Sequence, residues 1–400
     1  MDLKLLPTSV DGEELTALAE RSGRMLQKIR DSMLQPFPRK QPPTFSSVKV
    51  QDICGIDKLR MNYLLTKDKE FPQGEQIAKG RQRTFSLEET IRWVKGTKGK
   101  NKQRTAGTPG KVIAVANFKG GVTKTTTSMI LAQGLSLRHG RKVLIIDLDP
   151  QGSTTTFFGI NPHAEIEADQ TILPLIEKLQ PDLTYAPMQT YWTGVDLIPS
   201  STDLFNAEFI LPARVHGNDP TFQFHNVLLE GLQPLLQLYD YVIIDSAPTL
   251  SYLTINALFA ADAIIVPVVP DTLSFASMVQ FWTLFSDLVG GLKQSATAAK
   301  KKPYDYIDIL ITRMPVKSSA QMVRDWILKT YRDHVLPVEI PETGLAMTTS
   351  AEFSTVYDMP NYQGSATAYQ RICEPYDRLV DIVDSKSCLL WGIESTEEKN

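Results

Sequence analysis

Hydrophobic residues in the last two thirds of the chain occur in short continuous runs, separated by longer stretches with helical spacing. The runs are VIAVA (112–116), VLIID (143–147), VDLIP (195–199), YVIID (241–245), AIIVPVV (263–269) and IDILIT (307–312). Such runs are typical of strands buried on both faces. Their alternation with helices predicts an α/β unit over residues 111–400, with a mostly parallel twisted sheet and helices on both faces. Residues 161–190 and 286–303 lack this regularity and are expected to be surface excursions.

A helical pattern also occupies the start of the chain, where the apolar positions are Leu15, Leu18, Met25, Leu26, Ile29 and Met33. Prolines 36, 38, 42 and 43 then end the helix. A single helix of this length is marginal in isolation. It therefore packs on a partner subunit or on its own chain, and both options stay open. We predict an N-terminal dimerisation helix with a Pro-rich link over residues 1–43.

Residues 44–95 are typical of a winged helix-turn-helix domain. FSSVKVQDICGIDKLRMNYLL predicts two short helices around Gly55, with Ser46 or Ser47 capping the first helix and Asp57 the second. GRQRTF (80–85) predicts a β-wing, and Ser86 with Glu89 forms a capping box for a following helix. We therefore predict an α-helical winged helix-turn-helix domain that binds DNA.

A basic linker follows over residues 96–110, GTKGKNKQRTAGTPG. From Lys79 to Arg104 the chain carries nine basic residues and two acidic ones. A basic run beside a helix-turn-helix favours DNA contact over a merely solvated surface. The candidates for the major groove are Lys58 and Arg60, and those for phosphate contacts from the wing are Arg81 and Arg83.

The composition narrows the class of protein only a little. The net charge of −3 gives no overall bias toward nucleic acid, so DNA contact requires a local patch. Three cysteines without CxxC or metal spacing indicate a reducing compartment, and five dispersed histidines indicate no metal site or triad. Neither an 18-residue apolar run nor the apolar core of a signal peptide is present. We expect a cytoplasmic protein without a membrane partner.

The stretch NFKGGVTKTTT (117–127) lies between the strand predicted at 112–116 and a helix predicted over about 124–138. This is the context of a phosphate-binding loop, because backbone N–H groups and a helix N-terminus form an anion nest there. Gly120 and Gly121 let the backbone approach phosphates. Lys124 neutralises the terminal phosphates and the Thr125 hydroxyl ligates Mg²⁺. The expected ligand is a nucleotide with Mg²⁺.

Carboxylates stand at two further strand ends. Asp245 ends YVIID and can hold Mg²⁺, usually through water, or can simply cap a loop. Asp147 and Asp149 end VLIIDLD, and a carboxylate near the terminal phosphate orients the attacking water. The alternative for this pair is capping of a turn at Pro150. Given the loop, a nucleotide site accounts best for all three residues.

These segments carry a resemblance to a known family. KGGVTKTT (119–126) is similar to the deviant Walker A motif KGGxGKTT, and DLDPQGSTT and VIIDSAP resemble the two switch segments that accompany it. In order and spacing they resemble ParA-type partition ATPases of the larger class, which carries an N-terminal helix-turn-helix. ITRM (311–314) and the IP at 340–341 resemble the C-terminal part of that family, so the likeness covers nearly the whole chain.

The resemblance implies a P-loop NTPase of the deviant Walker A type and assigns roles to individual residues. The phosphate-binding residues are Lys119, Gly120, Gly121, Val122, Thr123, Lys124, Thr125 and Thr126. The catalytic residues are Lys119, Lys124 and Asp149, and the Mg²⁺ residues are Thr125 and Asp245. The switch residues are Asp147, Pro150, Gln151 and Ser246, and the adenine-contacting residues are Thr312 and Pro341.

Two residues of the loop differ from an ordinary phosphate loop. Lys119 matches the family's signature lysine, which implies that it reaches the partner's phosphates across a nucleotide-sandwich homodimer. Thr123 stands where the motif has glycine. If that position needs a positive φ, a β-branched residue costs on the order of 1–2 kcal/mol there.

The function implied by the resemblance is a slow, switch-like, Mg²⁺-dependent ATP hydrolase that segregates plasmid or chromosome copies. The ATP-bound dimer binds DNA without sequence preference, and a centromere-bound ParB-type partner stimulates hydrolysis. The helix-turn-helix represses the protein's own operon, and the protein is nucleoid-associated. Candidates for the non-specific DNA surface are Arg313, Lys317, Arg324, Lys329 and Arg332.

Two alternatives stay open. One is a nucleotide-sensing transcriptional repressor without a partition role, for which loss of Asp149 should change little. The other is a MinD-like positioning ATPase, which would end in a basic amphipathic helix, whereas CLLWGIESTEEKN has an acidic tail. A reductase that shares a metal cluster across its dimer needs cysteines at the cluster in the nucleotide domain, and Cys54, Cys373 and Cys388 are outside the positions expected for them. A metabolic ligase of the same fold would not need the helix-turn-helix.

Overall fold

The computed structural model describes residues 11–34, 40–68, 70–76, 83–98, 102–217, 222–295, 303–315, 318–345, 352–359 and 364–393. The chain separates into two compact units, Met1–Gln41 and Pro42–Asn400. The first unit contains helix α1 (Gly12–Leu34), which agrees with the helix expected from the apolar spacing. Its apolar residues Leu15, Leu18 and Met25 are exposed. Whether α1 mediates dimerisation stays a prediction.

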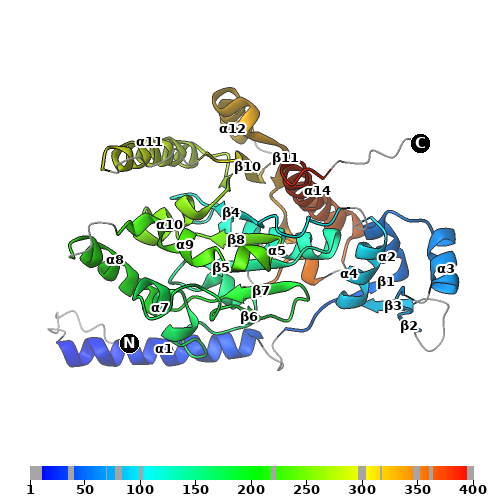
Figure 1. Ribbon diagram of the computed structural model, residues 1–400, viewed down its shortest axis with the longest axis horizontal. Coiled ribbons are helices and arrows are strands. Elements are labelled where there is room, and N and C mark those ends of the chain that lie inside the picture. Colours follow the sequence, from blue (N-terminus) through cyan, green and yellow to red (C-terminus); the bar gives the residue numbers. More distant parts are fainter. Residues whose placement is uncertain are drawn as a thin grey trace, which may run out of the picture. The chain divides into compact units, whose positions relative to one another are not determined.

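An eight-stranded sheet organises the second unit (Figure 1). Its strands are β4 (Lys111–Val115), β5 (Val143–Asp147), β6 (Met188–Gln189), β7 (Val195–Ile198), β8 (Tyr241–Asp245), β9 (Ala263–Val268), β10 (Tyr306–Met314) and β11 (Val335–Pro341). They lie in the order β11-β10-β9-β4-β8-β5-β7-β6. All neighbouring strands pair in parallel except β6 with β7. The mostly parallel sheet is therefore confirmed.

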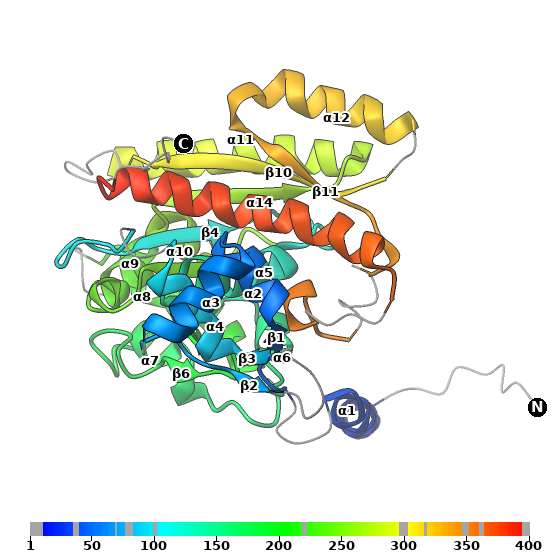
Figure 2. The same cartoon turned by 90° about the vertical axis from the view of Figure 1, so that its right-hand side faces the viewer.

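Helices cover both faces of this sheet. Successive residues of a strand point to opposite faces, so each strand contributes to both cores. Ile113 and Val115 of β4 face one core with α5 (Lys124–His139) and α14 (Ala366–Leu390). Val112 and Ala114 face the other core, which contains α7 (Leu173–Ile176), α8 (Ala207–Val215), α9 (Val227–Leu232), α10 (Tyr252–Ala260), α11 (Thr272–Ser295) and α12 (Ser318–Tyr331). Figure 2 shows α14 running along its face of the sheet.

Short elements complete the second unit. Helix α6 (Ser153–Phe157) follows β5. Single turns of 3₁₀ helix lie at Ala168–Gln170, Thr202–Asn206, Phe224–Asn226, Leu235–Gln237, Arg332–His334 and Val356–Asp358. Residues 161–190 are not the surface excursion that the sequence predicted, because Ile172, Leu173 and Ile176 are buried in the core.

Residues 286–295 are not irregular either, because they belong to α11, which ends at Ser295. Residues 296–302 lie outside the described part of the chain.

Residues 44–96 fold into helices and a small antiparallel sheet. The elements are β1 (Thr44–Ser46), α2 (Ser47–Cys54), α3 (Lys58–Lys67), β2 (Glu75–Gln76), β3 (Arg83–Ser86) and α4 (Leu87–Gly96), with strand order β1-β3-β2. Ser46 caps α2 and Asp57 caps α3, while Gly55 ends α2 at a φ of 66°. Ser86 and Glu89 form the expected capping box at the start of α4.

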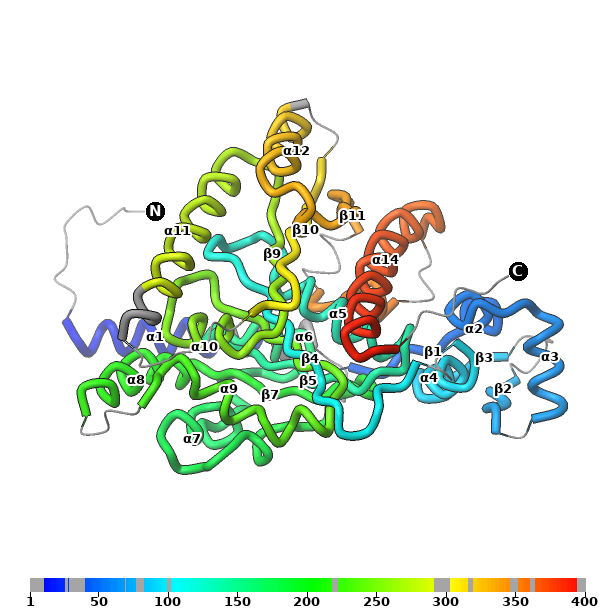
Figure 3. Tube along the Cα trace, turned by 45° about the horizontal axis from the view of Figure 1, so that its top comes forward, coloured from blue at the N-terminus to red at the C-terminus, as the bar shows by residue number. Residues whose placement is uncertain are grey.

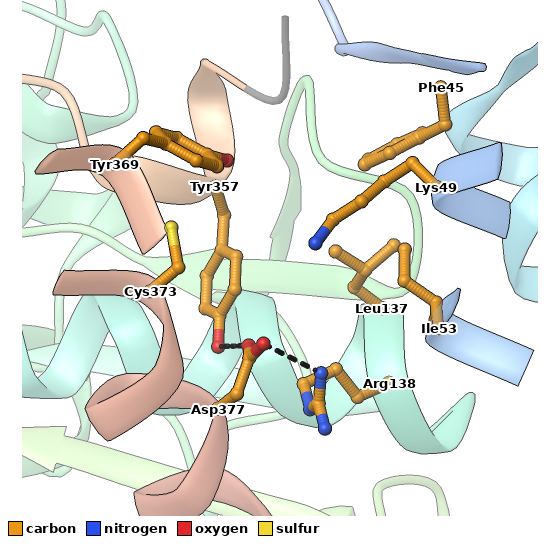
Figure 4. A pocket seen from close by; sticks show the side chains of 9 residues that line it. All are labelled: Phe45, Lys49, Ile53, Leu137, Arg138, Tyr357, Tyr369, Cys373 and Asp377. Carbon is orange, nitrogen blue, oxygen red and sulfur yellow. Dashed lines mark hydrogen bonds and ion pairs between the residues drawn. The ribbon is translucent and has the colours of Figure 1, made fainter. Parts of the chain in front are cut away.

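These N-terminal elements dock on α5 and α14 (Figure 3). Helix α4 packs on α5, and a Cβ added at Gly140 would lie 2.6 Å from Cγ of Lys95. A small cavity marks the junction. Figure 4 shows the side chains around it, which come from β1, α2, α5, α14 and the turn Val356–Asp358: Phe45, Lys49, Ile53, Leu137, Arg138, Tyr357, Tyr369, Cys373 and Asp377. In the linker, Arg104 pairs with Asp240 at 3.2 Å. The domain boundaries given above stay a prediction.

Among the described helices, none has both the length and the apolar character needed to cross a membrane.

Candidate functional site

The loop between β4 and α5 is fixed at its start by Asn117. The buried Asn117 amide donates to the Pro267 carbonyl at 2.8 Å, and its side-chain oxygen accepts from the Lys119 N–H at 3.0 Å. The loop therefore begins at a defined point between two adjacent strands of the sheet. Helix α5 starts at Lys124, as the sequence predicted.

Two residues of the loop have positive φ angles. Gly121 lies at 73°, where glycine carries no Cβ penalty, and Thr123 lies at 70°. Thr123 therefore has the positive φ at which a β-branched residue is strained. Its hydroxyl is also buried and has no hydrogen-bond partner within the described part of the chain. Thr123 thus combines an unfavourable backbone conformation with an unbonded hydroxyl at the N-terminus of α5.

Lys124 points back into the loop rather than outward. Its side chain is buried, and its Nζ donates to the Lys119 carbonyl at 2.8 Å. Burial lowers the pKa of Lys124, while the carboxylates of Asp245 and Asp149 act in the opposite direction. A cation that is buried and lacks a direct carboxylate contact is suited to an anionic ligand.

Lys119 lies on the outer side of the loop and contacts the start of α11. Its Nζ is 3.2 Å from Oδ1 of Asp271 and 2.6 Å from Oγ of Ser274. The lysine side chain is 30% exposed and the aspartate 45%, so this ion pair is half solvated. Asp271 and Ser274 were missed at the sequence level, although their position directly after an apolar strand places them at the carboxyl edge of the sheet.

Asp245 is the centre of a buried cluster of hydroxyl groups. Its Oδ2 accepts from Thr125 at 2.8 Å and from Thr154 at 2.7 Å, and its Oδ1 accepts from Ser128 at 3.1 Å. Burial raises the pKa of Asp245, and the hydroxyl hydrogen bonds and Lys124 offset part of the rise. Ser128 and Thr154 were not singled out from the sequence, although Ser128 lies one helical turn after Thr125.

Asp147 and Asp149 occupy different environments. Asp147 pairs in register with Asp245 on the adjacent strand, and its carboxylate accepts from both the N–H and the hydroxyl of Thr155 at 2.8 Å. Burial, together with Asp245, holds the pKa of Asp147 well above its usual range. Asp149 is partly exposed and accepts from the Gln151 N–H at 3.0 Å, the geometry of a turn cap.

The other switch candidates surround this cluster. Pro150 is buried, Gln151 is exposed, and the Ser246 hydroxyl donates to the Val115 carbonyl at 3.0 Å. Their arrangement ties the segments after β5 and β8 to the end of β4. Their role as switch residues stays a prediction.

The residues present fit a nucleotide phosphate with a divalent cation. A Cβ added at Gly121 would meet nothing within 4 Å, and one at Gly120 would meet only Pro248 at 4.0 Å, so the space over the loop is open. No group of three or more His, Cys, Asp or Glu residues that could hold a metal exists within the described ranges. Mg²⁺ would take Thr125 and Asp245 from the protein and its remaining oxygens from phosphate and water.

The two residues predicted to contact adenine lie in different surroundings. The buried Thr312 hydroxyl donates to the carbonyls of Val122 at 3.2 Å and Val268 at 3.4 Å, so it braces the loop. Pro341 is half-buried at the end of β11 and pairs with Met314. Their contact with adenine stays a prediction.

The predicted DNA residues fall into separate groups. Lys58 and Arg60 are exposed on the first turn of α3, while Arg83 contacts the Gln73 carbonyl. Arg313 lies beside the phosphate loop, 3.4 Å from the Gly121 carbonyl. Arg324 pairs with Glu339 at 2.5 Å, whereas Lys329 and Arg332 are exposed near the end of α12. Arg81 and Lys317 lie outside the described residues.

Comparison with known proteins places this geometry in a family. Residues 110–297 match the family model described as "AAA domain". The chain is 32% identical to protein SopA of Escherichia coli K12 over 67% of this chain and 71% of SopA. It is 29% identical to a putative replication protein A of Rhizobium rhizogenes over 98% of each chain.

A solved structure extends the comparison to bound ligands. The cobyrinic acid a,c-diamide synthase of Mycobacterium smegmatis, with a bound ATP analogue and magnesium, is 27% identical. It aligns with a TM-score of 0.54 over 68% of this chain and 94% of that chain. This likeness supports the binding of nucleotide and magnesium in the P-loop fold. Given the coverage of SopA, the chain belongs to the ParA/SopA-like family of partition ATPases.

Proposed function

We propose that this protein is a Mg²⁺-dependent ATPase that works as a slow switch in the segregation of plasmid or chromosome copies. The observation that carries the proposal is the pair of lysines in one loop. Lys124 turns inward beside the Thr125–Asp245 pair, and Lys119 lies on the outer side. Lys124 serves the bound nucleotide, and Lys119, which is held by a half-solvated ion pair with Asp271, serves a second subunit.

In this proposal the chain's own residues divide the chemistry. Backbone N–H groups of residues 119–126 and Lys124 hold the phosphates. Thr125 and Asp245 hold Mg²⁺, which neutralises phosphate charge when it is bound. Asp149 orients the attacking water, because its carboxylate is partly exposed and lies close enough to influence both Lys124 and Asp245. Lys119 leaves Asp271 and neutralises charge across a sandwich homodimer.

The proposal assigns two modes of DNA binding. The ATP-bound dimer binds duplex DNA without sequence preference, using exposed cations such as Lys329 and Arg332. The ADP-bound or nucleotide-free form binds its own operator through residues 44–95, acting as a winged helix-turn-helix. The α2–turn–α3 arrangement and the antiparallel strands β2 and β3 support this second mode. A ParB-type partner bound at the centromere stimulates hydrolysis.

Replacement of Asp149 separates this proposal from a nucleotide-sensing repressor. Asp149→Ala should reduce ATP turnover by 10²-fold or more, since general-base contributions are on the order of 10²–10⁴. ATP affinity should stay close to that of the wild type. The measurements are phosphate release with ATP and Mg²⁺ in the presence of duplex DNA, and fluorescent nucleotide titration.

Asp203→Ala is a matched control, because Asp203 lies in a 3₁₀ turn and accepts only from its neighbour Ser201 within the described chain. Its turnover should equal that of the wild type. Unchanged turnover in Asp149→Ala would favour the nucleotide-sensing repressor.

A further inference from the structure

Helix α3 presents a surface that the fold does not use. Met61 and Leu64 face the core, whereas Leu59 is 78% exposed and Tyr63 is 55% exposed. Leu59, Asn62 and Thr66 follow one another at three- and four-residue spacing on the outward side of the helix. Leu59 and Tyr63 therefore add little to the buried core of residues 44–96.

Charge identifies the kind of partner that this surface fits. The charged residues of α3 are Lys58, Arg60 and Lys67, all exposed and all basic. The Arg60 guanidinium stacks over the Tyr63 ring at 5.5 Å from its centroid, which holds both side chains at the edge of the outward side. A basic border around a narrow apolar and amide stripe is complementary to the groove of duplex DNA.

The Asn62 side chain is the group in this stripe that can distinguish bases. It is exposed, and its amide makes no hydrogen bond to any other described residue. The Thr66 hydroxyl, by contrast, already donates to the Asn62 carbonyl at 2.8 Å. A free amide offers one donor and one acceptor, which match N7 and N6 of adenine in the major groove. Leu59, one turn earlier, offers methyl groups that suit the thymine C5-methyl.

We infer that α3 reads an A·T-containing operator, with Asn62 bonded to adenine and Leu59 packed on a thymine methyl one turn of helix away. This inference rests on the proposed operator binding by residues 44–95, and it names the residues and bases that give that binding its specificity. Lys58, Arg60 and Lys67 position the helix by contacts to phosphates and lie at the edges of the outward stripe.

Selection from a pool of random-sequence duplex DNA tests the inference with the full-length chain. The selection is done with ADP, so that ATP-dependent non-specific binding does not mask the operator. The wild type should enrich a sequence with a required A·T pair. Asn62→Ala should lose the preference for adenine at one position, weakening binding to the selected sequence about 10-fold. Leu59→Ala should relax the preference for thymine nearby.

Lys67→Ala is the matched control, because Lys67 is exposed on the last turn of the same helix but carries only charge. It should weaken all sequences to a similar extent and lower the salt dependence, without changing the selected sequence. Because Asn62, Leu59 and Lys67 are all exposed, each variant should melt at the temperature of the wild type. Thermal melting therefore distinguishes a loss of base preference from a loss of fold.

The outcomes distinguish base reading by α3 from the proposed operator binding by residues 44–95. If the wild type selects an operator and Asn62→Ala selects the same one with equal preference, the reading role of α3 is overturned while operator binding stands. If the wild type selects no sequence, both are overturned, and the exposed stripe is better explained as a contact for a protein partner.

Discussion

Thr123 is the residue at which this phosphate loop departs most from its motif. Its φ of 70° belongs to the left-handed region, where a β-branched side chain is disfavoured, and its buried hydroxyl lacks a partner within the described chain. Strained residues of this kind persist where the surrounding structure holds them, and they cluster at ligand sites. The strain at Thr123 therefore lies at the point where a phosphate would be bound.

Thr123→Gly should raise the free energy of unfolding of the ligand-free protein by roughly 0.5–1 kcal/mol. The gain is the relief of left-handed strain minus the greater entropy of an unfolded glycine. Thr123→Ala is the control, because it also removes the hydroxyl but keeps a Cβ at positive φ. The measurement is denaturant unfolding, and equal stability of the two variants would show that the backbone is not strained.

Asp147 and Asp245 bring two carboxyl groups together in register at the edge of the sheet. Burial raises the pKa of both groups above the ordinary value of 3.8. For an acid whose pKa is raised by folding, the folded state is favoured below the unfolded pKa and loses that stability as the pH rises. The ligand-free protein should therefore lose stability as the pH rises from about 4 toward neutrality.

Asp245→Asn should remove part of this loss. At pH 7.5 we expect the ligand-free variant to be more stable than the wild type by about 1 kcal/mol, with the difference shrinking toward pH 4. Addition of Mg²⁺ to the ADP-bound protein should stabilise the wild type more than the variant, because the variant keeps the phosphate-binding groups and loses a magnesium ligand. Thermal unfolding from pH 4 to 8 measures both effects. A variant that is less stable at every pH would contradict the account.

Helix α5 is the element that joins the candidate site to the rest of the protein. Its sixteen residues span about 24 Å, from Lys124 at the loop to His139 at the junction with α4 and α14. At that far end Arg138 pairs with Asp377 at 2.9 Å and Asp381 at 2.6 Å. Just beyond it, the buried Arg141 pairs with Asp384 at 2.7 Å. The Arg138 pairs join α14 to α5, and the Arg141 pair joins α14 to the segment between α5 and β5.

Asp384→Ala should destabilise the protein by about 3–5 kcal/mol, because it leaves the Arg141 guanidinium buried without its partner. The buried Tyr241 hydroxyl, which is 3.0 Å from Asp384, loses its acceptor as well. Asp52→Ala removes an exposed partner of Lys49 and should cost less than about 1 kcal/mol. Denaturant midpoints compare the two, and a similar small loss for both would contradict a buried network.

The sequence predicts elements that are long or continuous and misses those that are short or interrupted. The six apolar runs each correspond to a strand, because a parallel strand buried on both faces needs no polar alternation. Strand β11 was not among them, since VLPVEIP alternates and contains two prolines. Helix α7 has only four residues, too few to show a helical period.

The same limit applies to the site. Residues 117–127 and the two strand-end segments are local patterns, so sequence reasoning can find them. The contact of Lys119 with Asp271 joins residues that are 152 positions apart, and the hydroxyls of Ser128 and Thr154 meet only around Asp245 in the folded chain. No spacing rule predicts such contacts, because the sheet order sets them.

At the scale of the whole molecule, the nucleotide loop and residues 44–96 are attached to opposite ends of one helix. The docking of α4 on α5 and the junction cavity in Figure 4 lie within one compact unit. The docking of the proposed DNA-binding element on the helix that follows the phosphate loop supports the proposal that DNA binding depends on the bound nucleotide. Loss of Lys119 should leave operator binding unchanged while abolishing the ATP-dependent mode.

The most direct test is non-specific duplex DNA binding with ATP, with ADP and without nucleotide, for the wild type and Lys119→Ala. The account predicts that the wild type binds only with ATP and that the variant does not bind under any of the three conditions, because Lys119 completes the dimer across the second nucleotide. Asp271→Ala, which removes the resting partner of Lys119, should still bind with ATP. Binding that ignores nucleotide, or that survives in Lys119→Ala, would contradict a sandwich dimer acting as a DNA-bound partition switch.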